Sequence, residues 1–282
     1  MFFMKENVKI KSPKVGVIMS VYNGEKYLKE AIESILNQTF RDFEFIIVND
    51  GSIDKTEDIL DDYAKQDSRM KIIKNRNNIG LTKSLNKAIQ DAKGEYIARM
   101  DADDISLPKR LEKQVKFMEK NPKVGLLGVA YYQMNSKGEI VGKNIFPISN
   151  KKLQKALIKY NHFFHASVMI RKNILNEAGL YNENIKSAQD YDLWFRIARV
   201  SKIANLSEFL MIQRYSMERI SINYKNKQMR SSIKIRKNAI RKGQYPLWCY
   251  IYLIRPYILL ILPFKVRNFL REHILRKIKI YR

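Results

Sequence analysis

Two aspartates at the end of a predicted strand are the residues best suited by type and spacing to do chemistry. Asp101 and Asp103 follow the strand-like run 95–100, with Ala102 between them. Alternate residues of a strand lie on one face, so both carboxylates are expected to point toward one ligand. Carboxylates this close repel unless a positive charge lies between them, and hard cations such as Mg²⁺ or Mn²⁺ prefer such oxygen ligands. The same spacing is common in solvated turns, so the position after a strand carries the prediction of a metal site.

Two further polar positions follow predicted strands. Tyr22 comes after the apolar run 15–19, and Asp50 comes after the run 43–48. In open parallel sheets, ligands bind beyond the carboxyl ends of the strands. We therefore expect these side chains to meet the aspartate pair at one edge of a sheet.

The elements that must position these residues alternate between strand and helix patterns. Strand-like apolar runs lie at 15–19, 43–48, 70–73, 95–100, 124–132 and 162–170, and helix-period stretches lie at 25–37, after 54, and at 81–92, 108–120, 151–160 and from 189. This alternation predicts an α/β fold with a Rossmann-like, mostly parallel sheet and helices on both faces.

Composition limits the class of protein. A chain of 282 residues that is 45% hydrophobic can form a packed core of one or two domains and is not wholly disordered. Cys249 is the single cysteine and there are three histidines, which excludes an internal disulfide and a Cys/His structural zinc site. The first residues lack the apolar core of a signal peptide, so we expect a cytoplasmic protein.

The net charge of +25 is concentrated near the end of the chain. Residues 223–282 contain sixteen Lys and Arg and one acid, Glu272. The apolar run 247–264 in this segment is interrupted by Arg255 and Pro256, and is too short for a membrane-spanning helix. The segment either lies on an anionic membrane surface or forms a helical pair packed on the body with solvated cations. Nucleic acid is not expected as a partner, because it would not explain the aliphatic block 258–262.

Five motifs in the first 215 residues resemble those of the family 2 inverting glycosyltransferases with the GT-A fold. They lie, in the family's order, at 15–23, 48–52, 78–86, 101–111 and 189–196. The resemblance is nearest to bacterial enzymes that assemble surface polysaccharides such as capsule and O-antigen. It implies metal-dependent transfer of a sugar from a UDP- or dTDP-sugar to a hydroxyl of a glycan or lipid-linked oligosaccharide.

The resemblance implies roles for the residues that bind the donor. Val21 and Tyr22 would line the pocket for the base, and Asp50 would accept a hydrogen bond from a base N–H. Asp101 would contact the ribose or the water shell of the metal, and Asp103 would bind the Mn²⁺ or Mg²⁺ that holds the diphosphate. For Asp50, a turn-forming role ahead of a glycine is the alternative.

The resemblance also implies a catalytic base. Asp190 would remove the proton of the acceptor hydroxyl as it attacks the anomeric carbon, and one such displacement inverts that carbon. Alternatively, Asp190 caps its helix and Asp192 is the functional acid. Trp194 either packs in the core or supports the acceptor sugar.

One part of the family pattern is missing from this sequence. Many members carry a histidine just after the position of Arg214, where this chain has Tyr215 and Ser216. Arg214 would then hold the diphosphate alone, with His162 or His165 as alternatives near the metal if they are not core residues.

These expectations define a domain organisation and a location. Residues 12–222 form the glycosyltransferase domain, with a nucleotide-binding half at 12–105 and an acceptor half at 106–222, and 223–282 form the basic amphipathic segment. We expect an enzyme in the cytoplasm, peripheral on the inner face of the cell membrane. The alternatives are a non-catalytic basic binding protein that retains the fold, and a processive polysaccharide synthase, whose Gln-x-x-Arg-Trp motif this sequence lacks.

Overall fold

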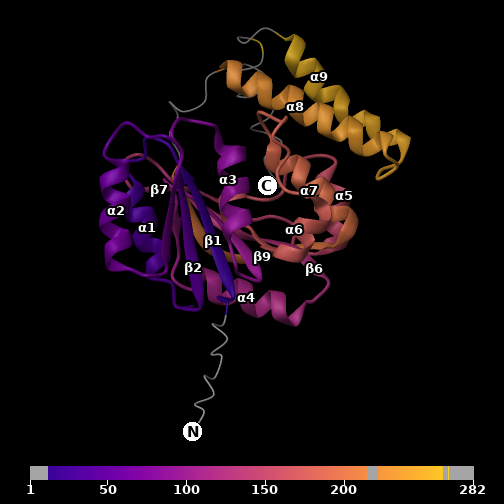
Figure 1. Ribbon diagram of the computed structural model, residues 1–282. Coiled ribbons are helices and arrows are strands. Elements are labelled where there is room, and N and C mark those ends of the chain that lie inside the picture. Colours follow the sequence, from indigo (N-terminus) through magenta and orange to yellow (C-terminus); the bar gives the residue numbers. More distant parts are fainter. Residues whose placement is uncertain (1–11, 215–221, 263–265, 267–282) are drawn as a thin grey trace.

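The computed structural model describes residues 12–214, 222–262 and 266, and its centre is one twisted sheet. Helices cover both faces of this sheet, and a pair of C-terminal helices packs at one end (Figure 1). The strand order is β3-β2-β1-β4-β8-β6-β9-β5, and β7 pairs with β6 outside this path.

The first half of the sheet is parallel, as the sequence predicts. Its strands are β1 (Val15–Val21), β2 (Phe43–Asn49), β3 (Met70–Lys74) and β4 (Tyr96–Asp101). They alternate with α1 (Leu28–Leu36), α2 (Thr56–Gln66) and α3 (Leu81–Asp91). Side chains of β1 alternate between two cores: Val17 and Met19 pack with α1, and Ile18 packs with α3. Because both faces are covered, the central strands are continuous apolar runs rather than alternating ones.

The second half of the chain forms a mixed sheet. Its elements are β5 (Ile105–Ser106), α4 (Arg110–Lys120), β6 (Val124–Met134), β7 (Ile140–Asn144), α5 (Asn150–Leu157), β8 (Met169–Arg171), α6 (Lys172–Ala178), α7 (Gln189–Val200) and β9 (Lys202–Arg214). The short β8 joins the halves, since it pairs antiparallel with both β4 and β6.

Two sequence expectations change in this half. The strand expected at 162–170 is reduced to β8, because residues 165–167 form a turn of 3-10 helix, η1 (His165–Ser167). The long strand β9 was not predicted, since its residues mix buried and exposed positions without a regular period. It pairs parallel with β6 and brings Arg214 toward the carboxyl end of β4.

The C-terminal segment forms α8 (Ile222–Arg241), η3 (Leu247–Tyr250) and α9 (Ile251–Ile261). Ile235, Ala239 and Ile240 of α8 are buried in the same core as α7, so this pair packs on the body. Across the described residues, none of the helices combines the length and the apolar character needed to cross a membrane.

Candidate active site

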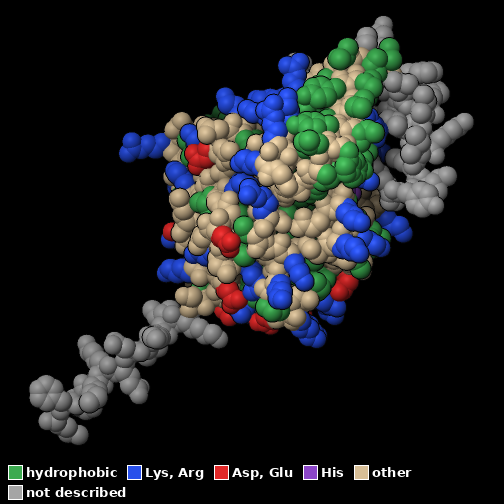
Figure 2. Space-filling view, turned by 90° about the vertical axis from the view of Figure 1, so that its right-hand side faces the viewer, with side chains coloured by type: hydrophobic (Ala, Val, Ile, Leu, Met, Phe, Trp, Pro, Cys, Tyr) green, Lys and Arg blue, Asp and Glu red, His purple; other side chains and the backbone are tan. Residues whose placement is uncertain are grey.

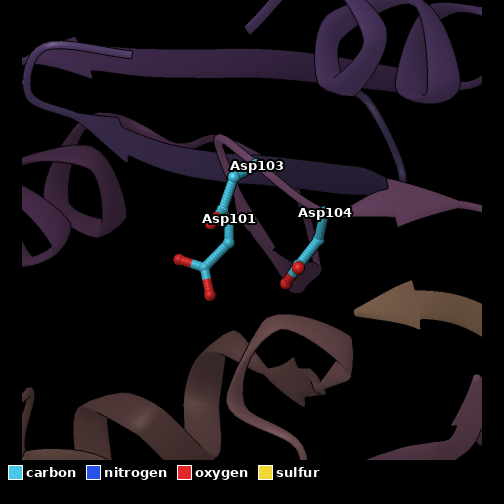
Figure 3. A group of neighbouring side chains, drawn as sticks. All are labelled: Asp101, Asp103 and Asp104. Atoms are coloured by element: carbon cyan, nitrogen blue, oxygen red, sulfur yellow. The ribbon is translucent and has the colours of Figure 1, made fainter. Parts of the chain in front are cut away.

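Three aspartates cluster at the carboxyl end of β4. Asp101 is the last residue of the strand, and one carboxylate oxygen each from Asp101, Asp103 and Asp104 lies within 4.8 Å of the others. Figure 3 shows that the three side chains extend to the same side of the chain. A turn after Asp101 brings them together, rather than the strand alternation that the sequence suggested. Asp104 was not among the predicted ligands, although the Asp-Ala-Asp-Asp sequence at 101–104 contained it.

Charge around the cluster is partly balanced by arginine. Arg99 on β4 is 2% exposed and forms an ion pair with Asp101. Asp104 is buried, and its removal from water, followed by repulsion from Asp101, raises its pKa to about 8. The pKa of Asp104 is raised because negative charge is poorly stabilised at this position, so an additional positive charge would be favourable here. The oxygen-only donor set and this electrostatic strain both fit a hard divalent cation such as Mg²⁺ or Mn²⁺.

Arg214 lies against this acidic loop, although 110 residues separate it from Asp104. Its backbone N–H donates to Asp104 Oδ1 at 3.0 Å, and its Nε donates to the backbone oxygen of Asp103 at 3.2 Å. Its guanidinium lies over the Tyr27 ring, 4.1 Å from the centroid, and pairs with Glu30. The structure therefore brings this predicted donor-binding residue to the edge where the aspartates lie.

Asp50 also lies at this edge of the sheet, and it has a structural role. Its Oδ1 accepts hydrogen bonds from Asn75 Nδ2 at 2.8 Å and from the Ile79 N–H at 3.0 Å, and its Oδ2 accepts from the Gly80 N–H at 2.9 Å. These bonds hold the loop that leads into α3. A carboxylate has about four acceptor positions, so one remains for a base N–H.

Val21 and Tyr22 differ in what they offer a ligand. Val21 is 2% exposed and belongs to the core, while its backbone oxygen accepts a hydrogen bond from the Asp50 N–H at 2.8 Å. Tyr22 is 49% exposed at the end of β1. Of these two predicted base-pocket residues, Tyr22 therefore presents the accessible side chain.

Asp190 lies in the first turn of α7 and is partly buried. Its Oδ2 accepts a hydrogen bond from Asn161 Nδ2 at 2.8 Å. Burial raises the pKa of Asp190 above the ordinary aspartate value, and hydrogen bonds and the charge of Arg99 offset part of that rise. A carboxylate with a raised pKa is a stronger base, which suits proton abstraction.

Asp192, the alternative acid, stabilises the start of α7. Its Oδ2 pairs with Arg196 Nε at 2.9 Å, one helical turn away. Arg196 also donates to the carbonyls of Ala178, Gly179 and Leu180, at the end of α6 and just after it. These contacts favour a structural role for Asp192 and leave Asp190 as the better candidate base.

Trp194 and His165 both lie in the core. Trp194 is 0% exposed and packs against the rings of Phe163 and His165, so its ring presents no surface to an acceptor sugar here. His165 Nε2 is hydrogen-bonded to Tyr181 Oη at 2.8 Å, and burial lowers the pKa of His165 well below its ordinary value. Of the two roles that the sequence allowed for Trp194, core packing is therefore the one that the structure describes.

Arg99 is a further residue of this region that sequence reasoning missed. It pairs with Asp101, and its positive charge also acts on Asp104 and Asp190. Arg99 therefore interacts electrostatically with both the acidic cluster and the candidate base. Asp101 and Asp104 are close to Arg99 in sequence, but Asp190 comes from another part of the chain, so the sequence gives no sign that one arginine acts on both groups.

Sequence comparison gives a family match over most of this region. The model for "Glycosyl transferase family 2" matches residues 16–179. An uncharacterized glycosyltransferase, MJ1057 of Methanocaldococcus jannaschii, is 45% identical over 71% of this chain and 70% of its own length. The O-antigen biosynthesis glycosyltransferase WbnJ of Escherichia coli is 39% identical over 70% of this chain and 78% of its own.

Structural comparison finds the same fold at low sequence identity. S. aureus TarS 1–349 in complex with UDP aligns with a TM-score of 0.67 and 20% identity, over 94% of this chain and 76% of TarS 1–349. A mannosyltransferase from Pyrobaculum calidifontis, in complex with GDP-Man and Mn²⁺, aligns with a TM-score of 0.64 and 18% identity, over 89% of this chain and 70% of its own. At these identities the likeness establishes the GT-A fold alone.

Proposed function

Because this chain belongs to glycosyl transferase family 2, we propose that it transfers a sugar, with inversion at the anomeric carbon, from a nucleoside-diphosphate sugar to a hydroxyl group. The observation that carries the proposal is the electrostatic grouping of an acidic cluster and a second, more basic carboxylate around Arg99. The first suits a cation and the diphosphate, and the second suits proton removal from the acceptor.

The residues at the carboxyl end of β4 would hold Mn²⁺ or Mg²⁺ through Asp101, Asp103 and Asp104. Such a cation, when bound, supplies positive charge that stabilises the departing diphosphate. Arg214 would add a second positive charge on the same side, since its guanidinium lies beside the acidic loop. A neighbouring structure of the same fold that holds Mn²⁺ supports this assignment.

Asp190 would accept the proton of the attacking hydroxyl at its carboxylate. Asn161 orients that carboxylate by donating to Oδ2 at 2.8 Å. A single base and a single displacement invert the anomeric carbon, because the hydroxyl attacks from the side opposite the leaving diphosphate.

We propose a UDP- or dTDP-sugar as the donor. The remaining acceptor position of Asp50 suits the ring N–H of uracil or thymine, and Tyr22 is accessible at the same edge. The UDP bound by TarS 1–349 supports this choice.

The donor assignment predicts a selective thermal shift. In a panel of UDP-, dTDP- and GDP-sugars with Mn²⁺, we expect a UDP- or dTDP-sugar to raise the melting temperature most. A ligand at 100 times its Kd stabilises the folded state by about 2.7 kcal/mol through mass action. The same panel with EDTA is the control, and we expect the shift to shrink there. A GDP-sugar that gives the largest shift would overturn the assignment of the base.

For the acceptor we propose a hydroxyl on a growing glycan or on a lipid-linked oligosaccharide of a surface polysaccharide. The similarity to WbnJ, whose name describes O-antigen biosynthesis, supports this class. A lipid-linked acceptor would require the enzyme to work at the inner face of the cell membrane. A non-catalytic binding protein is the competing possibility, and metal-dependent release of UDP from the donor by purified protein would exclude it.

A further inference from the structure

The outer side of η3 and α9 is an apolar stripe, which we call the α9 stripe. Its members are large hydrophobic residues that remain between 51% and 83% exposed: Trp248, Ile251, Ile254, Ile258 and Ile261. They recur every three or four residues, so they lie along one side of the helix. Figure 2 shows hydrophobic side chains gathered over the C-terminal helices, with Lys and Arg beside them.

The opposite side of the same elements is anchored in the protein. Cys249 and Leu253 are each 2% exposed and belong to the core shared with α7 and α8. Pro256 has no N–H, so the carbonyl of Tyr252 lacks its usual helical donor. Arg236 of α8 supplies one instead, with Nη1 to Tyr252 O at 3.3 Å. The stripe is therefore held outward by specific packing.

The charge around the α9 stripe has one sign. From 222 to 261 the sequence contains nine Lys and Arg and no Asp or Glu. Where the structure describes the side chains of this stretch, from 226 onward, the exposed cations are Lys227, Arg230, Lys234, Arg241, Lys242 and Arg255. An apolar helix side with cations beside it has the composition that binds at the interface of an anionic bilayer.

Charge also discriminates between possible occupants of the stripe. A second copy of this chain would bring the same cations against one another, and like charges at a contact oppose association. The residues that follow α9 are basic too, with seven Lys and Arg and one acid from 262 to 282. An anionic lipid surface has the opposite charge and accepts apolar side chains, so it satisfies both features.

We propose that the α9 stripe inserts into the interfacial region of an anionic membrane, with the cations of α8 and α9 at the lipid headgroups. The helix then lies in the plane of the membrane surface. This inference does not depend on the donor or the chemistry proposed above, because binding to vesicles is measured without substrate.

Tryptophan fluorescence offers a direct test on the full chain. The protein has two tryptophans, and Trp194 is fully buried, so a change on adding vesicles reports on Trp248, which is 64% exposed. We expect a blue shift and co-sedimentation with vesicles of phosphatidylcholine mixed with phosphatidylglycerol, and much weaker binding to phosphatidylcholine alone. Equal binding to both would contradict the electrostatic part of the proposal, and binding to neither would overturn it.

Paired variants separate the stripe from general surface hydrophobicity. Ile254 and Ile258 are 54% and 51% exposed, and Ile140 and Val141 of β7, away from α9 in Figure 1, are 52% and 56% exposed. We expect Ile254→Ser with Ile258→Ser to weaken vesicle binding by about tenfold or more, from the loss of apolar burial, and Ile140→Ser with Val141→Ser to leave it unchanged. Equal loss in both double variants would overturn the assignment to α9. A second result would also overturn it: the protein forms a dimer in sedimentation velocity, Ile254→Ser with Ile258→Ser alone abolishes that dimer, and the protein does not bind vesicles.

Discussion

Replacing the proposed base, Asp190→Asn, is expected to lower kcat by about 10²–10⁴ while the affinity for the nucleotide sugar stays nearly constant. The amide has nearly the same shape and can keep a hydrogen bond with Asn161 after rotating, but it cannot take a proton. Steady-state kinetics of UDP release, together with donor titration by thermal shift, measures the two quantities separately. A large loss of donor affinity with little loss of kcat would assign Asp190 a binding role.

Asp192→Asn is the matched control for this variant, because it lies two residues away on the same helix. It breaks the ion pair with Arg196 that secures the start of α7, so we expect a lower melting temperature with kcat largely retained. If Asp192→Asn instead gave the larger fall in kcat, the base would be Asp192.

The pH profile provides a second readout of the same assignment. The base must be ionised to act, and burial raises the pKa of Asp190 above that of an ordinary aspartate. Activity is therefore expected to fall on acidification at a higher pH than an ordinary aspartate would give, and to recover as the pH rises. The part of the acid limb that Asp190 contributes should be lost from the residual activity of Asp190→Asn, whereas a part contributed by Asp104, whose pKa is also raised, should remain.

Removing the cation is the second change for which we expect a large effect. We expect EDTA to abolish turnover, and Mn²⁺ or Mg²⁺ to restore it. Asp103→Asn is the more informative variant of the cluster, because substituting Asp101 would break its ion pair with Arg99, and Asp104 has the buried contact with the Arg214 N–H. Changes to residues that hydrogen-bond metal ligands typically weaken metal binding by about 10–100-fold. Loss of a direct ligand should raise the half-saturating Mn²⁺ concentration by at least as much.

An exposed acid outside the cluster provides the control for charge removal alone. Asp62, whose side chain is 71% exposed, faces Lys65 on α2, and Asp62→Asn is expected to leave the metal dependence unchanged. If Asp103→Asn matched Asp62→Asn in Mn²⁺ dependence, Asp103 would not be a metal ligand. Turnover that persists in EDTA would contradict a metal-dependent reaction altogether.

The sequence by itself determined the parallel half of the fold and the edge at which its polar residues meet. Buried parallel strands are continuous apolar runs, and the helices between them repeat every 3.6 residues, so both patterns are local and can be recognised without the fold. The carboxyl ends of such strands share one edge, which is why the positions of Asp50, Asp101 and Asp103 could be predicted from their place after strands. The family relationship followed in part from the same residues, since the motifs at 15–23, 48–52 and 101–111 lie where these strands end.

The tertiary structure decided what these residues contact. Asn161 and Arg214 act on the aspartates from other parts of the chain, and pairs this distant in sequence leave no periodic trace. Arg99 is only two residues from Asp101, but its effect on Asp190 also depends on the fold. Composition showed that the C-terminal segment is basic and apolar, but not which side of it is buried. Which side is buried depended on packing against α7 and on the hydrogen bond that Arg236 donates in place of the N–H that Pro256 lacks. The physical reason is that burial depends on the surface that a helix packs against and not on the helix alone.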